Sequence, residues 1–147
     1  MTHDKQGRYS QKESAAGEHD PSLVQAVERA AGPRGLSCAV AEELAADLGF
    51  PPNDVGAAAD SREIKLVGCQ LGLFGHETAD GRHPAFGPAG PLAPEMERRL
   101  GEALVDGRLP CAAAWAIAAD LGVERVEVAR ACEERGIKIS SCQLGAF

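Results

Sequence analysis

The strongest constraint on the fold is an internal repeat, because the second half of the chain repeats the first at an offset of 73 residues. Residues 36–74 and 109–147 align without a gap, and 19 of the 39 aligned pairs are identical. Both copies end in the same unusual string, "CQLGLF" in the first and "CQLGAF" in the second. The chain therefore consists of two copies of one unit of about fifty residues, a duplication and not a solenoid.

The repeat also sets the expected domain boundaries, with repeat one over 21–75 and repeat two over 94–147. The segment between them, 76–93, is rich in glycine and proline and predicts a linker. Residues 1–20 are polar, which predicts a disordered tail and no secretory leader. Since no apolar run approaches the ~20 residues that span a bilayer, we expect a cytoplasmic protein without a membrane partner, whose five cysteines are reduced.

The composition predicts a mainly α fold with short β-strands, because alanine is abundant and aromatic residues make up only 4%. Helices are expected at 22–31, 37–49, 52–62, 95–106, 110–122 and 125–135. The alternating strings "IKLV" and "IKIS" then predict one strand in each repeat. Since a lone strand leaves backbone groups unpaired, we expect the two strands to pair with each other. The repeats would then form an intramolecular pseudo-dimer, with their CQLG strings close together.

The string "AWAIAADLGVERVEVARA" at 114–131 carries a family resemblance. Ala118 lets two helices approach closely, Gly122 suits the turn between them, and apolar residues occupy the buried positions. This pattern resembles the helix-turn-helix motif, and repeat one matches it. With one helix before and a strand after, each repeat resembles a winged helix-turn-helix unit. The resemblance implies tandem winged-helix repeats, a transcription-regulator-like function and double-stranded DNA as the partner.

The resemblance implies that the third helix of each repeat lies in the major groove and contacts base edges. The positions of repeat one that would face DNA are Pro51, Pro52, Asn53, Gly56 and Ala57. Of these, Asn53 has a side chain that hydrogen-bonds a base, and repeat two offers Arg125 and Arg130.

The charge argues against DNA, because the net charge is −7 and none of the four segments is basic. The alternative is an acidic protein-interaction module that does not bind DNA. Its candidate residue is Trp115, which replaces the Glu42 of repeat one and is either a docking residue or a contact to the first helix.

A third alternative is a thiol-based metal or redox sensor, because four cysteines recur at equivalent positions: Cys38, Cys69, Cys111 and Cys142. Gathered near a pseudo-axis, they would suit zinc or an iron–sulfur cluster. Their spacing lacks the short chelates of most metal sites, and buried cysteine often packs as a small hydrophobe. We therefore predict no cofactor. The chain also lacks a phosphate-binding loop, an H-E-x-x-H string and a nucleophile elbow, so we do not expect an enzyme.

Overall fold

The computed structural model describes residues 20–85 and 92–147. Six helices and four two-residue strands lie in this part of the chain, which confirms the mainly α prediction. The first repeat contributes α2 (Pro21–Ala30), β1 (Leu36–Ser37), α3 (Cys38–Leu48), α4 (Pro52–Ser61) and β2 (Leu66–Val67). The second contributes α5 (Pro94–Ala103), β3 (Leu109–Pro110), α6 (Cys111–Leu121), α7 (Arg125–Glu134) and β4 (Ile139–Ser140).

The ends of the helices follow from local chemistry. The Ser37 hydroxyl accepts a hydrogen bond from the backbone N–H of Val40 at 3.2 Å, which caps the start of α3. α3 and α6 both end on a glycine with left-handed backbone, Gly49 at φ 76° and Gly122 at φ 68°. The repeat therefore predicted both ends of the second helix correctly.

The strand pairing differs from the prediction. β1 pairs with β2 and β3 pairs with β4, in parallel and within one repeat each. The backbone N–H of Leu36, for example, donates to the carbonyl of Lys65 at 2.8 Å. The expectation that the strands of the two repeats pair with each other is therefore wrong. The partner strands are β1 and β3, the two extended residues directly before α3 and α6. Two residues are too few to show an alternating pattern in the sequence.

The described residues form two compact units that do not coincide with the two repeats. The first unit consists of residues 20–69 and Gln143–Phe147, and the second consists of Gln70–Cys142. Each unit thus contains the three helices of one repeat and the Gln-Leu-Gly segment of the other. The predicted tail up to residue 19 and the linker residues 86–91 lie outside the described part of the chain.

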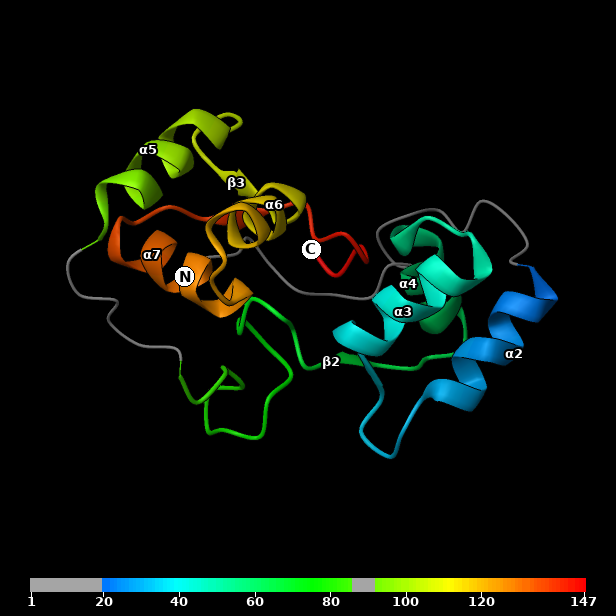
Figure 1. Ribbon diagram of the computed structural model, residues 1–147. Coiled ribbons are helices and arrows are strands. Elements are labelled where there is room, and N and C mark those ends of the chain that lie inside the picture. The colour runs from blue at the N-terminus through cyan, green and yellow to red at the C-terminus, as the bar shows by residue number, and fades with distance from the viewer. Residues whose placement is uncertain (1–19, 86–91) are drawn as a thin grey trace. The chain divides into compact units, whose positions relative to one another are not determined.

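Each unit has a core of small and medium apolar side chains. In the first unit α2 packs against α3 and α4, and these two also pack against each other (Figure 1). α5, α6 and α7 make the corresponding contacts in the second. The core includes Leu23, Val27, Leu36, Ala41, Val55 and Ala58 in the first unit, and Leu100, Leu109, Ala114, Ile117, Val128 and Ile139 in the second. Alanine at the crossings lets the helices approach closely.

Candidate functional site

The third helix of repeat one, α4, is enclosed by its own unit. Every residue from 55 to 60 is buried. α2 and α3 pack against this helix, and the main chain of Leu144 lies against Gly56. The expectation that Gly56 and Ala57 face DNA is therefore wrong. Asn53, on the first turn of α4, is exposed.

The third helix of repeat two, α7, is also largely enclosed. Val126, Val128, Ala129, Ala131 and Cys132 are buried, whereas the Glu127 side chain on the outer face is 43% exposed. The Arg130 side chain is 22% exposed, and its Nη1 donates to Glu127 Oε1 at 2.6 Å. This guanidinium is thus already paired one helical turn away.

Arg125 and Trp115 form a pair that repeat one lacks. The Arg125 guanidinium carbon lies 3.8 Å from the centroid of the Trp115 ring, a cation–π geometry. Trp115 is half-buried, and its indole Nε1 is buried with no hydrogen-bond partner among the described residues. The predicted DNA-binding Arg125 and the predicted docking residue Trp115 therefore contact each other.

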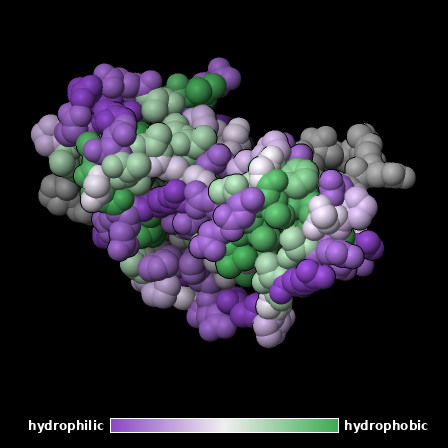
Figure 2. All heavy atoms as spheres, turned by 45° about the vertical axis from the view of Figure 1, so that its right-hand side comes forward, coloured by the Kyte–Doolittle hydropathy of each residue, from purple (hydrophilic) through white to green (hydrophobic). Residues whose placement is uncertain are grey.

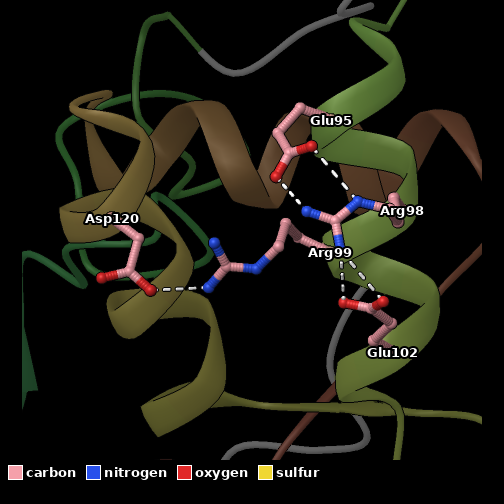
Figure 3. A network of polar contacts seen from close by, with 5 residues as sticks. All are labelled: Glu95, Arg98, Arg99, Glu102 and Asp120. Atoms are coloured by element: carbon pink, nitrogen blue, oxygen red, sulfur yellow. Dashed lines mark hydrogen bonds and ion pairs between the residues drawn. The ribbon is translucent and has the colours of Figure 1, made fainter.

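Two further arginines of repeat two are held by carboxylates on α5 and α6 (Figure 3). Arg98 lies between Glu95 and Glu102 on α5, and its Nη1 donates to Glu102 Oε2 at 3.0 Å. The hydrogen bond to Glu95, followed by the charge of Glu102, raises the pKa of Arg98. Arg99 Nη2 lies 2.6 Å from Asp120 Oδ2, so that this pair joins α5 to α6.

Other ion pairs join neighbouring elements of the same unit. Arg135 pairs with Glu97, which links the end of α7 to α5, and Arg82 Nη2 lies 3.7 Å from Glu133 Oε2. Residues 94–147 hold seven lysines and arginines. At least five of these seven contact groups of their own unit: Arg98, Arg99, Arg125, Arg130 and Arg135.

The four repeated cysteines carry free thiols. Cys38 and Cys111 are the first residues of α3 and α6, and both are buried. Cys69 is buried and Cys142 is half-buried. Within residues 20–85 and 92–147, no group of three or more histidine, cysteine or acidic side chains is placed to hold a metal ion.

The fifth cysteine, Cys132, lies on α7 and is fully buried. Burial, followed by the negative charge of Glu133, raises the pKa of its thiol to about 12. Since the thiolate is the reactive form of cysteine, this environment makes Cys132 a core residue.

One exposed apolar feature was missed from the sequence. Leu48 is 44% exposed at the end of α3, next to the half-buried Phe50 and the exposed Pro51. We call these three residues the apolar turn. The exposed carboxylates of Asp47 and Asp54 flank it in the sequence. Figure 2 shows hydrophobic side chains gathered on one face of this unit with hydrophilic ones beside them. The signal was the string "LGFPP", which repeat two replaces with "LGVER".

No helix in the described residues is long and apolar enough to cross a membrane. Comparison of the chain with family models, with curated proteins and with solved structures returns no significant match.

Proposed function

We propose that this chain is an acidic protein-interaction module, built from two winged-helix-like repeats. Its partner is a protein that docks on the apolar turn. The observation that carries the proposal is the 44% exposure of Leu48, a large apolar side chain, beside acidic residues. An exposed apolar cluster with a polar rim is typical of protein-binding surfaces.

Burial of the third helices favours a protein partner over DNA. A helix that reads the major groove presents an outward face to base edges. α4 has no exposed residue from 55 to 60, so the insertion of its middle into a groove would first require the unit to open. The outer face of α7 is acidic, since the Glu127 side chain is 43% exposed and Glu134 is exposed.

The charge distribution supports the same choice. DNA binding draws most of its free energy from lysine and arginine contacts to phosphates. The net charge is −7, and at least five of the seven cations in 94–147 contact groups of their own unit. At Arg98, Arg99, Arg130 and Arg135 a phosphate would have to displace a carboxylate that already pairs with the side chain.

The residues around the apolar turn define the chemistry of the partner. Leu48, Phe50 and Pro51 suit one or two apolar side chains, and Asp47 and Asp54 suit lysines or arginines beside them. In repeat two the equivalent residues are Leu121, which is half-buried, Val123, which is 38% exposed, and the charged Glu124 in place of Pro51, so this turn is less apolar. We therefore place the docking site in repeat one.

The test compares two exposed apolar residues. Tagged wild-type chain, Leu48→Asp and Val105→Asp are used to capture partners from cells of the source organism. The partner is then purified and its affinity remeasured at several salt concentrations. Val105 is the matched control, because it is 57% exposed and lies outside the apolar turn. Leu48→Asp is expected to bind the partner at least tenfold more weakly than wild type. Val105→Asp is expected to bind it with unchanged affinity. Equal binding by both variants would contradict the proposal.

DNA binding is the second candidate, favoured by the left-handed glycines that end α3 and α6 before a short turn and a third helix. A mobility-shift assay at low salt against mixed duplexes tests it. We expect no retardation of the duplexes. Retardation that is lost on Asn53→Ala, Arg125→Ala or Arg130→Ala would favour DNA and overturn the proposal.

A further inference from the structure

The first compact unit contains a segment that is remote in the chain. Residues Gln143–Phe147 belong to it, although residues 70–142 separate them from the rest of this unit. The segment is therefore held in its unit by non-covalent contacts, and its chain connection passes through the whole of the second unit.

The segment is well packed. Leu144 is 1% exposed and Ala146 is 2% exposed. On α4, Gly56 meets the main chain of Leu144 so closely that a Cβ at this position would lie 2.8 Å from the Leu144 carbonyl carbon. Glycine in a helix is unfavourable unless another backbone needs the space. Gly56 therefore makes the face of α4 a fitted site for this peptide.

The turn that leads into the segment is strained. Ser141 has a left-handed backbone, with φ 52°, and the equivalent residue of repeat one is Gly68, with φ 61°. Glycine adopts this conformation without cost and serine does not. The second repeat therefore enters its Gln-Leu-Gly segment through a less favourable turn than the first.

The corresponding segment of repeat one is anchored further along the chain. The backbone N–H of His83 donates to the carbonyl of Gly72 at 2.9 Å, and Arg82 lies close to Glu133 on α7. These contacts hold the loop that follows the segment within the second unit. Of the two segments, the one at 143–147 is thus the better candidate for release.

We propose that the face of α4 around Gly56 is a peptide-binding site for a Gln-Leu-Gly-Ala-Phe segment, and that a second copy of this chain supplies this segment in exchange for residues 143–147. Exchange of an identical element between copies preserves every contact at the site and is a known low-cost route to dimers. The chain's own segment competes at an effective concentration of about millimolar. The exchange therefore occurs at high protein concentration, or when a chain with a disabled segment meets a copy whose segment is intact. This site involves neither the apolar turn nor its partner.

Two complementary variants test the exchange in purified full chains. Leu144→Asp disables the segment and leaves the site intact, whereas Gly56→Leu blocks the site and leaves the segment intact. Each variant alone is expected to be monomeric in light scattering. An equimolar mixture is expected to give a one-to-one heterodimer. A mixture of two differently tagged Leu144→Asp chains is the control and is expected not to associate.

A peptide and wild-type chains supply further measurements that do not depend on Gly56→Leu. A fluorescent peptide of residues 138–147 is expected to bind the Leu144→Asp chain at least tenfold more tightly than the same peptide carrying that substitution. Two differently tagged wild-type populations, mixed at about millimolar concentration and then diluted, are expected to co-purify. Failure of the wild-type populations to co-purify, or equal binding of the two peptides, overturns the proposal. Neither result depends on the partner of the apolar turn.

Discussion

Replacement of Gly56 by alanine tests the docking of residues 143–147 most directly. A Cβ at this position would lie 2.8 Å from the carbonyl carbon and 3.2 Å from the Cα of Leu144, and the carbonyl oxygen is closer still. Carbon atoms in favourable contact are about 3.5–4.0 Å apart. The main chain of the segment must therefore move by about 0.7 Å or more. A backbone in a packed unit moves less readily than the end of a flexible side chain.

Two opposing effects decide the stability of Gly56→Ala. Alanine in a helix is favoured over glycine by about 1 kcal/mol. Overpacking costs about 1–3 kcal/mol, and release of the segment exposes Leu144 at a cost of about 1.5–3 kcal/mol. The cost of releasing the segment is larger than the helix gain, so we expect Gly56→Ala to be less stable than wild type by about 0.5–2 kcal/mol.

Gly101 on α5 is the matched control, because a Cβ built on this exposed helical glycine meets nothing within 4 Å. Gly101→Ala is expected to gain about 0.5–1 kcal/mol. The two variants should then differ by about 1–3 kcal/mol, or roughly 3–10 °C in Tm. The measurement is thermal unfolding followed by circular dichroism. A Gly56→Ala protein that melts at or above the temperature of Gly101→Ala would refute the docking argument.

Three further predictions follow from individual contacts. Because the pKa of Cys132 is raised from the ordinary 9.0 to about 12, the buried neutral thiol stabilises the fold below pH 9, and this contribution is lost as the pH rises from 9 towards 12. Cys132→Ala should show a shallower loss of stability over this pH range in urea unfolding, and an equal slope would contradict the assignment. Ser141→Gly should stabilise the chain by about 1 kcal/mol by relieving its left-handed backbone, and a lower urea midpoint would show that the turn is unstrained. Arg125→Ala should change the emission of Trp115, the only tryptophan, and destabilise the chain by about 0.5–1 kcal/mol, whereas an unchanged spectrum would argue against the cation–π pair.

The helices could be predicted from the sequence because the repeat supplies the same signal twice. Gly49 and Gly122 mark the ends of the second helices, and both have the left-handed backbone that favours glycine. The sequence predicts the end of α5 at Asp106, three residues beyond its actual end at Ala103. Val105 and Arg108 already exchange backbone hydrogen bonds in a tight turn, so the helix stops before them.

The contacts of the Gln-Leu-Gly segments could not be predicted in the same way. Each segment buries a leucine, since Leu71 and Leu144 are both 1% exposed. The apolar character of a residue carries no information about which helix covers its side chain. One signal was present, since Gly56 occupies the middle of a helix where repeat two has Ala129. A helical glycine costs about 1 kcal/mol relative to alanine, so its presence indicates a close approach of another backbone.

Coverage of α4 by residues 143–147 is better explained as peptide binding than as inhibition of DNA binding. An inhibitory segment would hide side chains that recognise DNA once they are released. Beneath this segment lies Gly56, followed by Ala57, and neither side chain donates or accepts a hydrogen bond. Release of the segment would thus expose an apolar face on an acidic unit, which suits another peptide and not a base edge.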